Sequence, residues 1–310
     1  MKFSLIVPTI GRPADLQRFI NHLSLQGCDR VDLREVELLV VDQSGESATG
    51  ELIARQQTPF TIRHLPMAGR GASRARNFGW SFARGEIITF PDDDCHYPVG
   101  LLAGVLDLFD DLDRDALMLQ VEHLGRQDQS GGAITRANVL FRCVESGFFV
   151  RSARAGDVRY DERMGVGAAS PWNSDEGPDL LLRLLDQGLN IHYAPELVIH
   201  HPNPLQTLDQ RLQNRCFQYS RGRGYLLRKH HFPAKVIANT LVRSLGGSLL
   251  MAATARPYWA RYYWNSFAGK MLGLMGGNNV PPQEISSPLT QVRTEELAMS
   301  PSAPYSVNGG

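Results

Sequence analysis

The segment Glu86-Ile87-Ile88-Thr89-Phe90-Pro91-Asp92-Asp93-Asp94 decides the fold, because an apolar run ends in three consecutive carboxylates. Like charges repel one another unless a cation lies among them. In open α/β sheets, ligands bind beyond the carboxyl ends of the strands. An isolated triple aspartate is more often a solvated turn or a helix cap. Here the preceding strand, and arginines upstream of it, favour a binding site at the edge of a sheet.

Apolar runs alternate with helix-like stretches over about the first 120 residues. This alternation predicts an α/β fold with a mostly parallel, Rossmann-like central sheet flanked by helices. The first run is too short for a signal peptide and lacks a cleavage site. Besides 86–90, the expected strands are Phe3–Val7, Val36–Val41, Thr61–Leu65 and Leu117–Val121. The expected helices are Pro13–Leu25, Ala72–Arg84 and Val99–Phe109.

The pattern becomes less regular from about residue 122 to 176, a region rich in Gly, Arg and Ser. A helix is expected from Pro178, a favoured first-turn residue, to Gly188, a natural C-terminal stop. An arginine-rich helix is expected over Thr207–Arg228. The remaining expected extended segments are Asn138–Cys143, Phe148–Val150, Asn190–Tyr193 and Leu197–His200.

The formal net charge of the 310 residues is zero, yet the charges are separated along the chain. Residues 1–210 carry a net charge of −9, while Arg211–Gln283 holds 11 basic residues and no acidic one. Such a basic segment predicts an anionic partner, and we expect residues 211–283 to face an anionic membrane surface rather than nucleic acid. The four cysteines are far apart and form no CxxC pair, which favours a reducing, cytoplasmic compartment.

Residues 232–275 are apolar and aromatic but interrupted by charges such as Lys235 and Arg243. These charges leave no uncharged apolar run of about 18 residues, so we expect no membrane-spanning helix. Aromatic side chains beside arginines fit amphipathic helices at a membrane surface, peripheral to the inner face of the plasma membrane. Ordinary docking helices are the equal alternative. Residues 276–310 are rich in Gly, Pro, Ser and Asn, and a disordered tail is expected there.

Two further segments carry groups that suit a phosphorylated ligand. Gly69–Trp80 contains Arg70, Arg74 and Arg76 near a helix start, where backbone N–H groups receive anions. Residues two apart do not share a helical face, so Arg70 and Arg74 are the pair expected to act together. The strand that ends in Asp42 places another carboxylate at the same sheet edge, where it could accept hydrogen bonds from a nucleobase or sugar.

Taken together, the motifs resemble the inverting glycosyltransferases of family 2, which have the GT-A nucleotide-diphospho-sugar fold. The similarity spans about residues 3–202, with the motifs in the family's order. The matching segments are Ile6-Val7-Pro8-Thr9 with Arg12-Pro13, Val40-Val41-Asp42, Ala75-Arg76-Asn77-x-Gly79, Phe90-x-Asp92-Asp93-Asp94, Tyr160-Asp161-Glu162-Arg163 and Asp179-Leu180-x-x-Arg183-Leu184.

The resemblance implies a role for each matching position. Asp42 would contact the nucleotide base, and Asp94 would ligate Mn²⁺ or Mg²⁺ together with Asp92, which also faces the sugar or ribose. His201 is a weaker candidate for the same metal. The other implied nucleotide-sugar-binding residues are Pro8, Thr9, Arg12, Arg70, Arg76 and Asp93.

Inversion also needs a general base that deprotonates the acceptor hydroxyl. The family carries an acidic residue before the Asp-Leu helix, and with Asp179 held in register that position is Gly177, which has no side chain. A shift of one residue makes Glu176 the expected base, with Asp175 second. Asp179 itself is expected to be a structural carboxylate at the helix terminus.

The resemblance thus implies a metal-dependent enzyme that transfers a sugar from a nucleotide-diphospho-sugar to a glycan or polyprenyl-linked acceptor. The expected catalytic domain is 1–205, with a nucleotide-sugar half at 1–121 and an acceptor half at 122–205. Residues 206–275 would be a basic helical extension. The alternatives are a non-catalytic GT-A protein that binds glycan or nucleotide in a polysaccharide assembly complex, and a nucleotidyltransferase with the same metal cleft.

Overall fold

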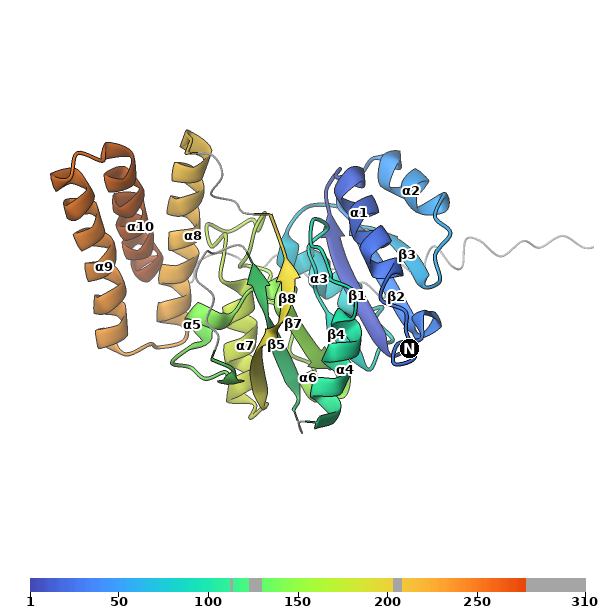
Figure 1. Ribbon diagram of the computed structural model, residues 1–310. Coiled ribbons are helices and arrows are strands. Elements are labelled where there is room, and N and C mark those ends of the chain that lie inside the picture. Colours follow the sequence, from blue (N-terminus) through green and yellow to red (C-terminus); the bar gives the residue numbers. More distant parts are fainter. Residues whose placement is uncertain (112–113, 123–129, 203–207, 277–310) are drawn as a thin grey trace, which may run out of the picture. The chain divides into compact units, whose positions relative to one another are not determined.

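An eight-stranded sheet with helices on both faces forms the centre of the computed structural model (Figure 1). The structure describes residues 1–111, 114–122, 130–202 and 208–276. The strands lie in the order β3-β2-β1-β4-β7-β5-β8-β6. Pairs β1–β2, β1–β4, β2–β3 and β5–β8 are parallel, while β7 and β6 pair antiparallel with their neighbours. The predicted α/β class with a mostly parallel sheet is therefore confirmed.

The first half of the chain alternates strands and helices as the sequence predicts. The strands are β1 (Phe3–Thr9), β2 (Val36–Asp42), β3 (Thr61–Pro66), β4 (Ile87–Thr89) and β5 (Ala116–Glu122). The helices are α1 (Pro13–Ser24), η1 (Leu33–Glu35, one 3₁₀ turn), α2 (Ser47–Ala54), α3 (Ala72–Trp80) and α4 (Leu101–Asp111).

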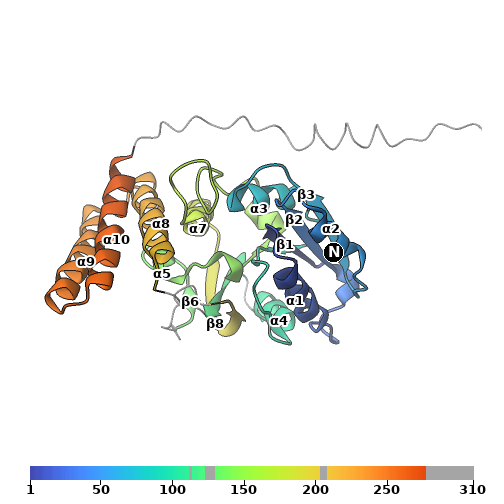
Figure 2. The ribbon, with the colours of Figure 1, turned by 90° about the horizontal axis from the view of Figure 1, so that it is seen from above.

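Side chains of the central strands alternate between two apolar cores, one on each face of the sheet. Leu5 and Val7 of β1 pack on one face, whereas Ile6 packs on the other. Figure 2 shows α1 and α4 on one side of the sheet and α3 and α7 (Glu176–Asp186) on the other. Because both faces are covered, the central strands β1, β2 and β4 are mostly apolar, which is why these segments were recognisable as buried strands.

The second half contains β6 (Gly132–Ala133), α5 (Val139–Arg142), η2 (Glu145–Gly147), β7 (Phe148–Arg151), α6 (Ser152–Ala155) and β8 (Ile191–His200). The expectation of a strand over Asn138–Cys143 is wrong, since this segment forms α5. The side chains of Val139 and Leu140 are buried on the same side of this short turn. Periodicity alone does not distinguish such a short apolar run from a strand.

Two other boundaries differ from expectation. The extended segments 190–193 and 197–200 form one strand, β8, whose pairing with β5 shifts register after Leu119. The residues around Pro195 fall in that irregularity, which explains the interruption in the pattern. Helix α7 begins at Glu176 rather than Pro178, and Pro178 lies in its first turn, where no hydrogen bond from the backbone nitrogen is needed.

Three helices follow the sheet: α8 (Gln210–Lys229), α9 (Ala234–Ala253) and α10 (Pro257–Met275), which run side by side in Figure 1. Glycines let α8 and α10 approach closely, since a Cβ atom at Gly224 would lie 2.2 Å from the Lys270 carbonyl oxygen. The expected tail lies outside the described residues from position 277 onward.

Helix α9 is long and apolar enough to cross a membrane by length and composition, and only 6% of its apolar window is buried. The charges of Lys235 and Arg243 therefore do not by themselves rule out a span, contrary to the sequence argument. A single helix of this kind is weak support for a transmembrane segment.

Candidate functional site

The carboxyl ends of three neighbouring parallel strands meet at one edge of the sheet. Thr9 at the end of β1 is paired with Asp42 at the end of β2. Strand β4 lies on the other side of β1, and its last residue, Thr89, is followed within three residues by Asp92. The structure therefore brings Thr9, Asp42 and the three aspartates to the same edge, as expected for the binding edge of an open sheet.

Asp93 is the structural member of the acidic triplet. Its side chain is fully buried, accepts a hydrogen bond from the Thr9 hydroxyl at 2.7 Å, and pairs with Arg12 at 2.5 Å. Burial raises the pKa of Asp93 to about 7, even though Thr9 and Arg12 oppose this shift. The contacts of Asp93 thus hold the triplet against β1. The side chains of its two neighbours, Asp92 and Asp94, make other contacts.

Asp92 and Asp94 converge on His201, which follows β8. The His201 Nε2 atom lies 3.6 Å from Asp92 Oδ2 and 3.3 Å from Asp94 Oδ1. Two backbone hydrogen bonds between His96 and His200 bring the end of β8 to this position. One donor atom each of Asp92, Asp94, Cys95 and His201 lies within 4.8 Å of the others, a spacing that suits a metal ion.

The donor chemistry of this group fits a hard divalent cation. Asp94 Oδ1 is buried and accepts no hydrogen bond within the described residues, which leaves it available as a ligand. The carboxylate donors suit Mn²⁺ or Mg²⁺. Burial and the neighbouring aspartates raise the pKa of the Cys95 thiol, so this residue stays protonated and packs in the core.

Arg76 links the acidic triplet to helix α7. It is only 4% exposed, and its guanidinium group lies 3.1 Å from Asp92 Oδ1 and 3.1 Å from Glu176 Oε1. Arg70 precedes α3 and is exposed, so it does not share a helical face with Arg74 as the spacing argument assumed. Arg76, which that argument set aside, is the arginine that faces the carboxylates.

Asp42 lies at the rim of the same edge, on the far side of β1 from β4. It is 3% exposed and accepts hydrogen bonds from the backbone N–H and hydroxyl groups of Ser44. His64 Nε2 on β3 lies 3.1 Å from its second oxygen. Burial raises the pKa of Asp42, but the Ser44 and His64 contacts outweigh it and bring the pKa below its ordinary value. Pro8 lies on β1 and the exposed Arg12 in the turn after it, and β1 lies between β2, which carries Asp42, and β4, which leads to the triplet.

The two expected base residues stand at the start of α7. Glu176 is 5% exposed, and burial raises its pKa despite the ion pair with Arg76. Asp175 has a left-handed backbone with φ of 62° and pairs with Arg223 of α8 at 2.7 Å. Gly177 donates its backbone N–H to Glu145 Oε1 at 2.9 Å. Both expected residues are therefore held by arginines.

The remaining motif residues have structural partners. Asn77 of α3 donates to the carbonyl of Tyr160 and to Glu162, each at 3.0 Å, which anchors the segment 160–163 to α3. Asp179 is fully buried and pairs with Arg183, Lys229 and His230 at 2.9, 2.5 and 2.8 Å. Asp179 is thus enclosed by two cations and an imidazole ring, as a structural carboxylate would be.

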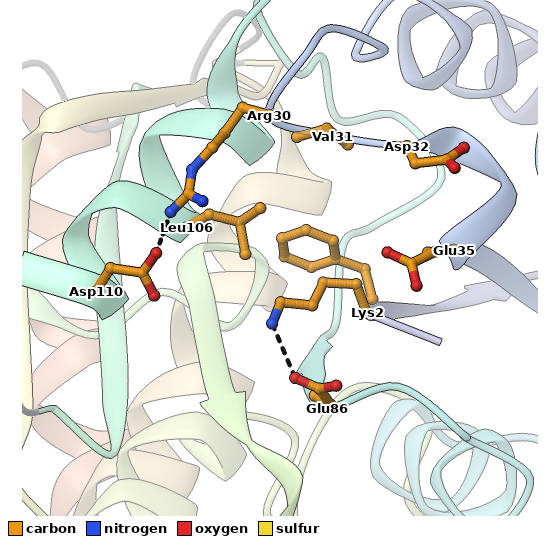
Figure 3. A pocket seen from close by; sticks show the side chains of 9 residues that line it. Lys2, Arg30, Val31, Asp32, Glu35, Glu86, Leu106 and Asp110 are labelled. Carbon is orange, nitrogen blue, oxygen red and sulfur yellow. Dashed lines mark hydrogen bonds and ion pairs between the residues drawn. The ribbon is translucent and has the colours of Figure 1, made fainter.

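A hollow of about 240 Å³ lies elsewhere, at the amino ends of β1 and β4. Figure 3 shows Lys2 paired with Glu86 and Arg30 paired with Asp110 around it. Both basic side chains that line it, Lys2 and Arg30, are engaged in exposed ion pairs. It is also at the opposite edge of the sheet from Asp92, so it is not the candidate site.

The sequence analysis missed three residues at the site: His64, Glu145 and Arg223. His64 stands inside a recognisable strand, and its position near the strand end could have drawn attention to it. Glu145 occupies an irregular segment with no local signal. Arg223 was counted with the basic segment expected to face outward, and only the fold shows that it points to Asp175.

Comparisons with known proteins agree with this geometry. Residues 4–146 match the family model described as "Glycosyl transferase family 2". The poly(ribitol-phosphate) beta-N-acetylglucosaminyltransferase TarS of Staphylococcus aureus is 25% identical over 124 residues, 39% of this chain and 21% of that protein. An uncharacterized glycosyltransferase of Nostoc sp. is 24% identical over 132 residues, 42% of this chain and 39% of that protein. The chain thus matches well under half the length of these relatives.

Solved structures share the fold over more of the chain. Residues 1–349 of S. aureus TarS in complex with UDP-GlcNAc superpose with a TM-score of 0.57 and 16% identity, covering 88% of this chain and 91% of that one. The mannosyltransferase PcManGT from Pyrobaculum calidifontis, in complex with GDP-Man and Mn²⁺, gives 0.59 and 16%, covering 88% and 87%.

Proposed function

Residues 4–146 of this chain are a glycosyl transferase family 2 domain, and from this premise we propose that the protein transfers a sugar from a nucleotide-diphospho-sugar to a hydroxyl group of a glycan or lipid-linked acceptor. The fold around the domain is GT-A, as its structural neighbours indicate. The observation that carries the proposal is the convergence of Asp92, Asp94 and His201 beside Arg76 at the carboxyl edge of the sheet.

The donor is proposed to lie along this edge. Asp42 accepts hydrogen bonds from the base, in a pocket lined by Pro8, Thr9 and Arg12. Arg70, exposed beside the start of α3, and Arg76 lie on the phosphate side, where guanidinium groups suit diphosphate oxygens. Asp93 acts through Thr9 and Arg12, since its own side chain is buried.

Asp92, Asp94 and His201 are proposed to hold Mn²⁺ or Mg²⁺. When bound, the ion neutralises negative charge on the departing nucleoside diphosphate. The Mn²⁺ found with the GDP-sugar in the mannosyltransferase structure supports this assignment. Asp92 would also face the sugar or ribose, held in orientation by Arg76 at 3.1 Å.

Transfer is proposed to proceed with inversion, by direct attack of the acceptor oxygen on the anomeric carbon. A base must take the hydroxyl proton, and we place it among the carboxylates around the amino end of α7. The sequence expects Glu176 there, with Asp175 second. Burial of Glu176 raises its pKa above the ordinary value, which makes its carboxylate a stronger base.

The test is a screen of UDP- and GDP-sugars for stabilisation of the protein and for donor turnover, each with Mn²⁺ and with a chelator. We expect stabilisation and turnover that both need the metal. Asp94→Ala should lower turnover at least about 100-fold while the fold remains intact, since the metal supplies several kcal/mol of charge stabilisation. Asp110→Ala, an exposed aspartate at the opposite edge, is the matched control.

Full turnover by Asp94→Ala would refute the metal assignment. Donor binding without any turnover, with or without acceptor, would instead favour the non-catalytic alternative. The observation that favours this alternative is the glycine at position 177, which has no acidic side chain.

We also propose that α9 and α10 bring the protein to an anionic membrane surface. Exposed apolar side chains on these helices include Val242, Leu249, Leu250, Trp264 and Met275. They lie in the segment 211–283, which carries 11 basic residues and no acidic one. Apolar groups beside basic ones bind interfaces through burial together with attraction to anionic lipid.

Co-sedimentation with vesicles tests this surface. We expect binding to vesicles that contain phosphatidylglycerol, weaker binding at high salt, and weak binding to phosphatidylcholine alone. Leu249→Ser/Leu250→Ser should reduce binding, whereas Leu25→Ser, an exposed leucine after α1, should not. Equal binding to both vesicle types at all salt concentrations would contradict the electrostatic part.

A further inference from the structure

The carboxyl group of Glu145 fills the space that a side chain at position 177 would occupy. A Cβ atom built on Gly177 would lie 2.5 Å from Glu145 Oε1 and 2.7 Å from both its Cδ and Cγ atoms. The Gly177 N–H group donates to the same Oε1 atom at 2.9 Å. A carboxylate is therefore present at the position where the resemblance expects one, but it comes from η2 instead of α7.

Helix η2 is fixed against the sheet, which gives Glu145 a defined position. Ser146 is fully buried, and a Cβ atom on Gly147 would lie 2.6 Å from the Leu119 carbonyl oxygen of β5. The backbone of η2 thus lies directly on the backbone of β5, and β7 follows at once from Phe148. A side chain carried on such a rigid support is suited to a role that needs accurate placement.

The three carboxylates around the start of α7 differ in their partners. Glu176 is paired with Arg76, and Asp175 is paired with Arg223. Glu145 forms no ion pair with any described residue, and the residue as a whole is half-buried. An ion pair with a guanidinium group favours the charged carboxylate and weakens it as a base. Burial, with the nearby Glu176 charge, raises the pKa of Glu145 to about 7.

We propose that Glu145 takes the proton from the acceptor hydroxyl group, supplying from η2 the carboxylate that position 177 lacks; this rests on the glycosyl transfer proposed above. A Glu145 carboxylate oxygen accepts the hydroxyl proton while the acceptor oxygen bonds to the anomeric carbon. The bond from that carbon to the diphosphate breaks, and its electron pair leaves with the nucleoside diphosphate. Glu176 is then a positioning residue that holds Arg76 beside Asp92.

Four variants test this assignment against wild type, with Glu86→Gln at the far edge of the sheet as the control. Glu145→Gln should lower kcat about 100- to 10,000-fold, the range for loss of a general base, with donor affinity unchanged. Glu176→Gln should change donor affinity through Arg76. Glu145→Ala removes the atoms that a Cβ at position 177 would meet, and Glu145→Ala/Gly177→Asp returns a carboxylate from α7. We expect this double variant to recover at least tenfold over Glu145→Ala.

The outcomes separate the two proposals. If wild type transfers sugar and Glu145→Gln stays within tenfold of it, the assignment to Glu145 is overturned. A double variant that is folded by circular dichroism yet no more active than Glu145→Ala also overturns it, because Glu145 would then act only in packing. If wild type transfers no sugar from any donor that it binds, the proposed function fails instead.

Discussion

Substitution of Asp179 by asparagine should destabilise the protein by about 3 kcal/mol, because it breaks a fully buried ion-pair group. Asp179 is 0% exposed and lies within 3 Å of Arg183, Lys229 and His230. Removing one member of a buried pair costs about 3–5 kcal/mol. Here Arg183 and Lys229 are partly exposed, and Lys229 keeps its ion pair with Asp161. Asparagine keeps the shape and some hydrogen bonds, which places the expected loss at the lower end of that range.

Thermal and urea unfolding measure this loss. For a protein of 310 residues, about 3 kcal/mol corresponds to a fall in Tm of roughly 5 °C, because the entropy of unfolding is about 2.1 cal/mol/K per residue. The matched control is Asp186→Asn on the same helix, whose ion pair with Arg136 is exposed. Exposed pairs contribute about 0–1 kcal/mol, so this variant should unfold close to wild type. A loss below about 1 kcal/mol for Asp179→Asn would refute the reasoning.

The pKa of Asp179 determines how the stability difference between wild type and Asp179→Asn changes with pH. Burial raises the pKa of Asp179, but His230, Lys229 and Arg183 together hold it below its ordinary value. Folding therefore favours the charged form, and this stabilisation is complete above the unfolded pKa of about 3.9. It is lost as pH falls through the lower folded pKa. The difference in the free energy of unfolding between wild type and Asp179→Asn should be largest at pH 7 and become smaller below about pH 4. A difference that becomes larger as the pH falls would contradict this reasoning.

Three further substitutions test the packing and the donor edge. Leu180→Ala removes a fully buried side chain and should cost about 2–5 kcal/mol in thermal unfolding; a loss below 1 kcal/mol would argue against a rigid core there. Gly224→Ala places a Cβ atom 2.2 Å from the Lys270 carbonyl oxygen, so it should cost about 1–3 kcal/mol by forcing α8 and α10 apart, and an unchanged Tm would show that they separate freely. Asp42→Asn should weaken nucleotide binding about 10- to 100-fold by calorimetry, and equal affinity would remove Asp42 from the base pocket.

The central sheet could be predicted because its sequence signal is local. The central strands β1, β2 and β4 are buried on both faces, so the segments around Leu5, Leu39 and Ile88 are mostly apolar and can be recognised without knowledge of their neighbours. The position of the acidic triplet followed from the same strands, since it comes directly after one of them. The short helix at Val139–Arg142 could not be recognised in this way. Its four apolar and basic residues are too few to show a helical period of hydrophobicity.

The partners within the site could not be predicted, because they come from distant parts of the chain. Arg76 meets Glu176 across 100 residues, and Arg223 meets Asp175 across 48. Helical spacing addressed only neighbours on one helix, and so it favoured Arg70 with Arg74 over Arg76. The distribution of charge along the sequence showed the excess of basic residues in α8 but not which way their side chains point. At least Arg223 and Lys229 compensate buried carboxylates instead of facing outward.

The contacts of Arg223 with Asp175 and of Lys229 with Asp179 bear on how this fold could be divided or recombined. A truncation after residue 205 would remove Arg223 from the buried Asp175 and would leave Asp179 with Arg183 as its remaining basic partner among the described residues. In a chimaera with a related transferase, residues 174–179 and α8 would have to be exchanged as a single block. Selection on one of these two segments therefore constrains the other, whatever surface the last two helices serve.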